Sequence, residues 1–159
     1  MYKQYTIERL KINFKTLEEF KKFQSFGAQE LSMLEDLEAN MIENDSNSPF
    51  YGIHFGGKLV ARMSLYTISQ KFDRYFEPPQ DYLELWKLEV LPEYQGKGYG
   101  RALVDFAKSF NLPIKTNGRN NSHDFWSKMG FETVTYNTER DRGENPFVWF
   151  PKGVSEQTL

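Results

Sequence analysis

The stretch EVLPEYQGKGYGRALVDF, residues 89 to 106, decides how the rest of this sequence is interpreted. It contains glycine at every second position from Gly96 to Gly100, after a strand-like run and before an amphipathic helix-like run. The first turn of a helix has about four amides without a partner inside the helix, and the helix dipole adds positive charge there. A glycine-rich turn at that point therefore favours an anion such as a phosphate or a pyrophosphate.

Two common phosphate-binding motifs can be tested against the spacing of these glycines. A P-loop needs four residues between its first glycine and a Gly-Lys-Ser/Thr sequence, and this pattern is absent. A dinucleotide fingerprint that begins at Gly96 needs a third glycine at position 101, which is Arg101. The residues alone leave two alternatives, a pyrophosphate site of another kind and a turn that is only structural.

Before the turn, residues 5–14 alternate as a strand, and Thr16 with Glu19 has the spacing of a capping box. Apolar residues then follow a helical spacing to residue 41, with an interruption at Gly27 that predicts two helices or one broken helix. Strand-like runs flank Gly56-Gly57 over residues 50–55 and 58–66, which predicts a hairpin. Residues 69–81 form a longer loop with several aromatic residues that look exposed, and residues 82–91 form the next strand.

After the turn, the sequence predicts a helix that ends before Pro113, a short strand over residues 112–116, and a short helix over residues 122–129 that stops at Gly130. A final strand pair is expected over residues 131–136 and 147–150. This order predicts a mixed α/β (α+β) fold, a mostly antiparallel sheet of about six to seven strands with helices on both faces. Residues 1–151 are expected to form one domain, followed by a polar tail over residues 152–159.

The composition limits the classes of function. The net charge of −2 and the pI of about 5.8 argue against a surface built for nucleic acid, and we expect no nucleic-acid partner. No apolar run approaches the roughly 20 residues that span a bilayer, and the N-terminal stretch lacks the apolar core of a signal peptide. The chain has no cysteine, which excludes disulfides and thiolate chemistry. We therefore expect a cytoplasmic protein without a membrane partner.

Two motifs together indicate a family. Gln95-x-x-Gly98-x-Gly100, preceded by LEVLPEY and followed by an amphipathic helix, resembles the acetyl-CoA-binding signature of the GNAT (Gcn5-related) N-acetyltransferases. About 27 residues later, FWSKMGFETV over residues 125–134 is similar to the short helix and strand of that family, often written F-Y-x-K-x-G-F. The whole sequence also resembles the bacterial YlbP-type branch of the family, which implies no particular acceptor.

The resemblance implies acetyl-CoA as cosubstrate and assigns residues to it. Main-chain groups of Leu88 and Val90 would pair with the pantetheine arm, like an added strand. The pyrophosphate would be held by the amides of the turn, which are those of Gln95, Gly96, Lys97, Gly98, Tyr99, Gly100 and Arg101. Lys97 and Arg101 either add positive charge or are solvated surface residues. Asn117 and Asn120 lie near the point where the family often has an asparagine, although neither has the commonest spacing.

Acetyl transfer from a thioester needs a neutral amine, and an alkylamine is mostly protonated at neutral pH. The resemblance places Glu84 where some members of the family have a general-base glutamate, six residues before Val90. The alternative for Glu84 is a cross-strand ion pair or a solvated strand end. Glu89 is a second candidate, although Lys87 on its face of the strand makes an ion pair the competing interpretation.

The family's frequent general acid is the tyrosine of F-Y-x-K-x-G-F, and here that position is Trp126. An indole N–H does not titrate near pH 7, so Tyr136 or water would have to protonate the thiolate. Trp126 otherwise fits a core residue. This departure leaves a second function open, a CoA-binding or interaction module of the same fold with weak or no catalysis.

His54 and His123 lie far apart without clustered acids, so we expect no metal site and assign both to structural or surface roles. The loop FDRYFEPP over residues 72–79 shapes an acceptor cleft, makes an oligomer contact or is a mobile connection. Acidic residues before the strand suit a cationic acceptor, a small-molecule or peptide amine, but an ordinary solvated loop explains them equally well. The sequence is compatible with a monomer or a homodimer.

Overall fold

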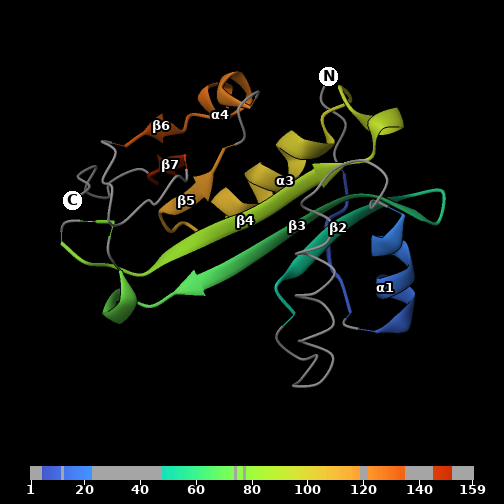
Figure 1. Cartoon of the computed structure of the whole chain (residues 1–159), viewed down its shortest axis with the longest axis horizontal. Helices are drawn as coiled ribbons and strands as arrows, with labels where there is room; N and C mark the ends of the chain where they lie inside the picture. Colours follow the sequence, from blue (N-terminus) through green and yellow to red (C-terminus); the bar gives the residue numbers. More distant parts are fainter. Residues whose placement is uncertain are drawn as a thin grey trace. The chain divides into compact units, whose positions relative to one another are not determined.

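A computed structural model describes residues 5–11, 13–22, 48–73, 75–76, 78–118, 122–134 and 145–151 of the chain. Within these residues, seven strands form one mixed sheet in the order β1-β2-β3-β4-β5-β7-β6 (Figure 1). The strands are β1 (Glu8–Arg9), β2 (Phe50–Phe55), β3 (Lys58–Ile68), β4 (Tyr82–Val90), β5 (Ile114–Asn117), β6 (Glu132–Thr133) and β7 (Pro146–Trp149). The α-helices are α1 (Phe14–Lys21), α3 (Tyr99–Lys108) and α4 (His123–Lys128), and the 3-10 helices are η3 (Gln70–Phe72) and η4 (Pro92–Tyr94). The mixed, mostly antiparallel sheet expected from the sequence is confirmed.

The chain divides into two compact units, which we describe separately. The first comprises residues 1–65 and 87–103, and the second comprises residues 66–86 and 104–159. β3, β4 and α3 each continue from one unit into the other.

The β2–β3 hairpin is the centre of the first unit, and it forms where the sequence predicts it. Gly56 and Gly57 have φ values of 59° and 79°, the left-handed conformation that a two-residue turn of type I′ requires. Phe55 and Lys58 face each other across the turn, and β1 pairs antiparallel with β2. The strand expected over residues 5–14 was too long, because pairing is confined to Glu8–Arg9 and the helix already begins at Phe14.

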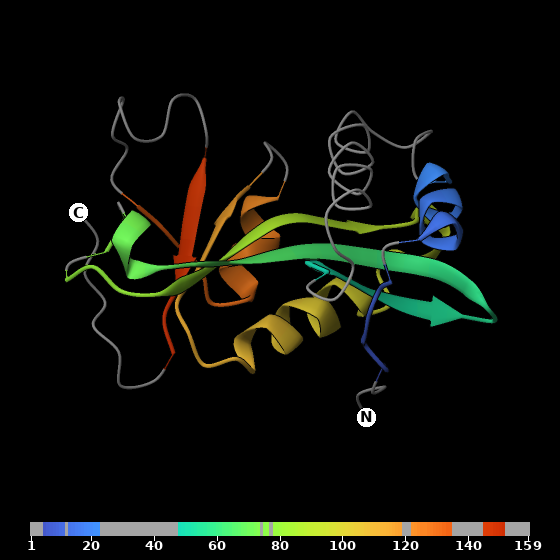
Figure 2. The same ribbon diagram turned by 90° about the horizontal axis from the view of Figure 1, so that it is seen from below.

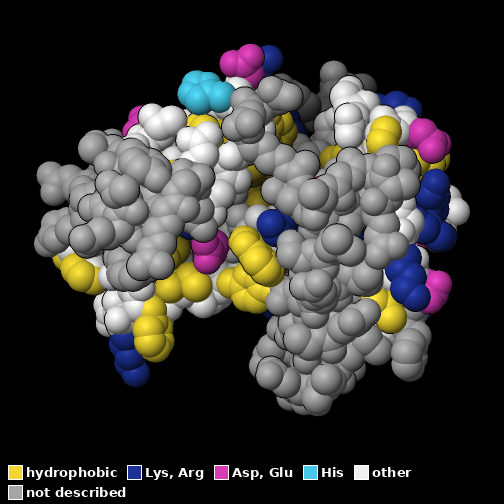
Figure 3. All heavy atoms as spheres, in the orientation of Figure 1, with side chains coloured by type: hydrophobic (Ala, Val, Ile, Leu, Met, Phe, Trp, Pro, Cys, Tyr) yellow, Lys and Arg dark blue, Asp and Glu magenta, His cyan; other side chains and the backbone are white. Residues whose placement is uncertain are grey.

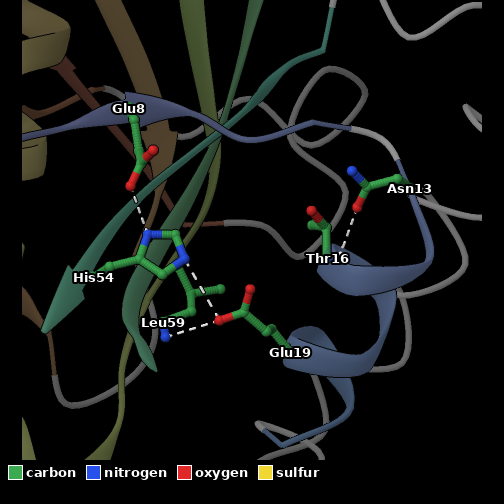
Figure 4. A network of polar contacts seen from close by, with 6 residues as sticks. All are labelled: Glu8, Asn13, Thr16, Glu19, His54 and Leu59. Atoms are coloured by element: carbon green, nitrogen blue, oxygen red, sulfur yellow. Dashed lines mark hydrogen bonds and ion pairs between the residues drawn. The ribbon is translucent and has the colours of Figure 1, made fainter. Parts of the chain in front are cut away.

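Helix α1 begins one turn earlier than the capping box predicts, and its cap is Asn13 (Figure 4). The Oδ1 atom of Asn13 accepts a hydrogen bond from the main-chain N–H of Thr16 at 3.0 Å. The assignment of Thr16 as the cap was therefore wrong, and Glu19 does not reach back to it. Instead Glu19 Oε2 accepts from the N–H of Leu59 at 2.9 Å, which ties the helix to β3.

Replacing Asn13 with alanine is expected to lower the free energy of unfolding by about 1 kcal/mol, because the side-chain cap of α1 is lost. Urea titration measures this change. Thr16→Val is the matched comparison, since it removes the hydroxyl of the cap predicted from sequence and keeps the side-chain shape. A larger loss for Thr16→Val than for Asn13→Ala would contradict the observed cap.

Apolar side chains of α1 pack against the β2–β3 hairpin, beside which the helix lies in Figure 2. The buried cluster consists of Leu10, Leu17, Phe20, Phe50, Leu59 and Leu91. At its edge His54 links two elements, because its Nδ1 lies 2.6 Å from Glu8 of β1 and its Nε2 lies 3.4 Å from Glu19 of α1 (Figure 4). This position agrees with the structural role expected for His54. The rest of the helical stripe expected up to residue 41 lies outside the described residues.

In the second unit, β5 lies between β4 and β7. β4 and β5 are parallel, whereas β5 with β7 and β6 with β7 are antiparallel. Helix α4 ends where the sequence predicts, and Gly130 follows it with a φ of 87°. Tyr75 and Phe76 are buried with Tyr82 and Val148, so the expectation that the aromatic residues of this loop are exposed was wrong for these two. Edge-on ring contacts to Tyr82 explain their burial.

The surface of the described residues is mixed in character. Three large hydrophobic side chains are exposed, Phe55, Phe72 and Phe110, and Phe72 has 73% of its surface accessible. Figure 3 shows hydrophobic side chains reaching the surface on one face, with acidic and basic side chains interspersed around them. Among the described helices, none has the length and apolar character that would carry it across a membrane.

Candidate functional site

The turn between β4 and α3 is exposed and has the conformation that its glycines permit. We call residues 95–98 the glycine loop. Gly96 and Gly98 have φ values of 75° and 90°, a region that other residues rarely adopt. A Cβ atom added at Gly96 would meet nothing within 4 Å, so the backbone there is open to an approaching group. The loop leads directly into the first turn of α3, whose amides face outward along the helix axis.

Three hydrogen bonds hold the backbone at and beside the glycine loop. The Gln95 side-chain amide donates to the main-chain carbonyl of Val90 at 3.0 Å, and this bond fixes the start of the loop against the end of β4. The Tyr5 hydroxyl donates to the main-chain carbonyl of Lys97 at 2.7 Å. The carbonyl of Gly98 accepts from the N–H of Ala102 at 3.0 Å, which begins the hydrogen-bond ladder of α3. The loop is therefore a defined structure and not a loose connection.

Two lysines add positive charge beside the loop. The Nζ atoms of Lys97 and Lys58 lie 5.7 and 5.8 Å from the ring centroid of Tyr94, within the range of a cation–π contact. The exposed Phe55 packs against the same ring, with 6.0 Å between the centroids. Sequence reasoning missed Lys58, because this lysine comes close to Tyr94 only when the β2–β3 hairpin is folded. Arg101 is exposed on the first turn of α3.

Leu88 and Val90 lie on the last part of β4, which leads to the loop, and both are partly buried. Glu89, between them, forms an ion pair with Arg62 of β3 at 3.1 Å, and the Arg62 side chain is fully buried. Glu89 is thus ion-paired as expected, but its partner in this contact is Arg62, not the Lys87 that the sequence suggested. The main-chain N–H of Lys87 donates to Ser64 Oγ at 3.1 Å. The Glu89 side chain keeps only 13% of its surface accessible, which makes it the weaker candidate for a base.

In the second unit, Glu84 of β4 lies opposite Lys115 of β5 in the parallel register. The Lys115 Nζ atom is 2.9 Å from Glu84 Oε2, so the cross-strand ion pair that was the alternative for Glu84 is present. The Lys115 side chain is only 3% exposed, whereas the Glu84 side chain keeps 27% of its surface accessible. The ammonium also lies 4.8 Å from the ring centroid of Tyr75. One oxygen of the Glu84 carboxylate is thus held by a buried cation, while part of the side chain remains accessible to an approaching group.

Lys115 was also missed by sequence reasoning. A lysine inside a short apolar strand is a signal that could have found it, because a buried lysine requires an anionic partner.

Asn117 lies at the end of β5, and its Oδ1 atom is buried. Within the described part of the chain this oxygen has no hydrogen-bond partner, which is costly unless a donor arrives from a ligand or from another part of the chain. Asn120 and Tyr136, also predicted as site residues, lie outside the described residues.

Trp126 of α4 is buried, and its ring lies 5.0 Å from the rings of both Phe125 and Phe131. These contacts agree with the interpretation of Trp126 as a core residue. His123 is exposed at the start of the same helix and contacts the ring of Phe147. The described residues contain no group of three or more His, Cys, Asp or Glu side chains placed to hold a metal ion.

The chain is similar to known proteins in both sequence and fold. The model of the Acetyltransferase (GNAT) family matches residues 14–131. An uncharacterized N-acetyltransferase of Halalkalibacterium halodurans is 74% identical over 97% of this chain and 91% of its own length. The solved structure of the N-acetyltransferase YlbP of Bacillus subtilis in complex with coenzyme A is 66% identical, covers 92% of this chain and 97% of its own, and gives a TM-score of 0.79. The PaiA N-acetyltransferase of Thermoplasma acidophilum, solved with coenzyme A, shares the fold at 17% identity over 92% of this chain and 98% of its own, with a TM-score of 0.63.

Proposed function

Because this chain belongs to the GNAT family of acetyltransferases, we propose that it moves an acetyl group from acetyl-CoA to an amine acceptor. The observation that carries the proposal is the glycine loop, exposed, with Gly96 and Gly98 at positive φ, directly before α3. Coenzyme A is also the ligand in the solved structure of the similar Bacillus subtilis protein. The YlbP-type resemblance inferred from the sequence agrees with that relative.

The residues present fit coenzyme A. The amides from Gln95 to Arg101 would hold the pyrophosphate. The space beside Gly96 is open, and because glycine has no side chain to fill it, the ligand can approach the backbone there. Lys97 and Arg101 would add positive charge, and main-chain groups of Leu88 and Val90 would pair with the pantetheine arm. The buried Oδ1 of Asn117 would accept from a donor of the ligand.

The reaction needs little from the protein beyond positioning and the movement of protons. Acetyl-CoA supplies the acetyl group as a thioester. Glu84 would take the proton of the acceptor ammonium, directly or through a water, so that the nitrogen lone pair becomes available. The Lys115 ammonium holds one oxygen of Glu84 in place. Tyr136 or water would return a proton to the leaving thiolate, because the Trp126 indole has no titrating group near neutral pH.

We further propose that residues 1–151 act as one catalytic domain in the cytoplasm, on a small-molecule or peptide amine. The protein would work as a monomer or a homodimer without nucleic acid. The mixture of acidic and basic side chains in Figure 3 and the net charge of −2 support an acceptor that is not a polyanion.

A second candidate function is a CoA-binding or interaction module with weak or no catalysis. It is favoured by one observation, the buried Trp126 at the position of the family's frequent tyrosine acid. Both functions predict binding of CoA, and only the transferase predicts release of CoA that depends on an acceptor.

Calorimetric titration of the full chain with acetyl-CoA and with CoA tests the binding that both functions require. We expect saturable heat at sub-millimolar ligand for each. An intact fold by circular dichroism with no heat from either ligand would contradict the proposal.

A further inference from the structure

The side chain of Tyr5 contacts the glycine loop at the peptide that joins Lys97 to Gly98, although Tyr5 is far from this loop in the sequence. We propose that Tyr5 is a positioning residue for coenzyme A, which fixes the direction of the Gly98 amide through the Lys97 carbonyl. This inference rests on the proposed function, because it assigns a role toward the pyrophosphate group. No pattern in the sequence marks Tyr5 as a residue of the cosubstrate site.

The peptide between Lys97 and Gly98 is planar, which couples the directions of its two polar groups. The carbonyl of Lys97 and the N–H of Gly98 belong to one planar trans peptide, so they point in opposite directions. The Tyr5 hydroxyl donates to that carbonyl at 2.7 Å. Holding the carbonyl toward Tyr5 therefore directs the Gly98 N–H away from Tyr5, toward the open side of the loop.

Such control is needed because a glycine lies on one side of this peptide. Rotation of the peptide changes ψ of Lys97 and φ of Gly98. Gly98 sits at positive φ, and a glycine passes between positive and negative φ at little cost. The peptide between Lys97 and Gly98 can therefore rotate unless something outside the loop holds it. A rotated peptide would present its carbonyl to the pyrophosphate in place of its N–H, which opposes anion binding.

The Tyr5 ring is itself held in place. It stacks on the ring of Tyr99, with 4.2 Å between centroids and 27° between planes. Tyr99 is buried in the first turn of α3 and also receives an edge contact from Tyr94. A Cβ atom added at Gly98 would lie 3.8 Å from Cε2 of Tyr5, so the ring runs alongside the loop. Burial, with the neighbouring Tyr5 and Tyr94, raises the pKa of the Tyr99 phenol above its ordinary value.

Tyr5→Phe keeps the ring and its stacking but removes the hydroxyl. We expect its Kd for CoA, from calorimetry, to rise about three- to tenfold, the range that corresponds to one hydrogen bond. The KM for acetyl-CoA should rise by a similar factor, and kcat at saturating acetyl-CoA should stay within about twofold. Pantetheine, which lacks the pyrophosphate, should inhibit Tyr5→Phe and the unmodified chain equally.

Tyr51→Phe is the matched control. It also removes a tyrosine hydroxyl of the first unit that takes part in a hydrogen bond, in this case accepting from Arg9 at 2.8 Å. Tyr51 lies on β2, outside the residues assigned to CoA, and we expect its Kd for CoA to be unchanged. Thermal unfolding of both variants separates a local effect from a loss of fold.

The outcomes are distinct. Weaker binding of CoA by Tyr5→Phe alone, with pantetheine unaffected, supports the inference. Equal affinity of Tyr5→Phe and the unmodified chain for CoA overturns it and leaves the proposed function standing. No binding of CoA by the unmodified chain overturns both. An equal loss in Tyr5→Phe and Tyr51→Phe overturns the specific role of Tyr5, because it indicates a general effect on the fold.

Discussion

Glu84→Gln is expected to lower kcat for acetyl transfer by about 10²- to 10⁴-fold, the usual contribution of a general base. The Kd for CoA should be nearly unchanged, because Glu84 is assigned to the acceptor amine and not to the cosubstrate. The loss should be largest at low pH, where most acceptor molecules arrive protonated and depend most on a base. Steady-state rates across pH, together with calorimetry, measure both quantities.

Glutamine is the informative replacement at this position. Its amide oxygen can still accept a hydrogen bond from Lys115, so the variant loses the negative charge of the pair but leaves the buried ammonium with an acceptor. Glu89→Gln on the same strand is the matched control, since it also replaces a carboxylate that is paired with a buried cation, at a side chain that is only 13% exposed. A Glu84→Gln enzyme with an unchanged pH–rate profile, or a larger loss in Glu89→Gln, would remove Glu84 from the role of base.

Gly98→Ala is expected to raise the Kd for CoA at least tenfold. At a φ of 90° an alanine is strained, so the loop relaxes toward negative φ and turns amides away from the ligand. Losing even one charge-assisted hydrogen bond to a phosphate costs about 1.5–3 kcal/mol, or about 10- to 150-fold in affinity. Calorimetric titration with CoA measures the change.

Gly57→Ala gives a matched control for the strain itself. Gly57 also has a positive φ, 79°, and an added Cβ atom there would meet nothing within 4 Å. It belongs to the β2–β3 turn and is assigned no contact with CoA. Both variants should lose about 1–2 kcal/mol of stability, but only Gly98→Ala should lose affinity. Equal affinities in the two variants would contradict the assignment of the glycine loop to the pyrophosphate.

The parts of the fold that the sequence predicts well are those set by neighbouring residues. The Gly56-Gly57 turn forces a hairpin, and Gly130 ends α4, because each glycine acts on the residues next to it. The helix after the glycine loop follows from its apolar spacing, and it runs from Tyr99 to Lys108, so its first residues already include the last glycine of the turn. These are local effects of backbone conformation and periodicity, which a sequence displays directly.

The contacts that define the candidate site are of another kind. Lys115 meets Glu84 only because β4 and β5 pair in one particular register, and Tyr5 meets Lys97 although the two lie 92 positions apart in the sequence. No spacing in the sequence encodes either contact. The cap of α1 was misassigned for a related reason, because Asn13 and Thr16 are both good capping residues and only the backbone at Asn13 is extended.

The resemblance supplied an expectation that neither periodicity nor spacing could, namely that the ligand of the glycine loop is coenzyme A. The glycines by themselves indicated an anion. The second motif, around Trp126, narrowed the expected anion to the pyrophosphate of coenzyme A. Trp126 itself raised a further question, whether the protein transfers the acetyl group or only binds the cosubstrate.

The measurement that tests the central claim most directly is release of free CoA from acetyl-CoA by the unmodified protein across a panel of amines and peptides. Thiol detection should show release that depends on at least one acceptor, and mass spectrometry should find that acceptor heavier by one acetyl group. The same release should collapse in Glu84→Gln. Tight binding of acetyl-CoA without any acceptor-dependent release would contradict the transferase function and favour the CoA-binding module.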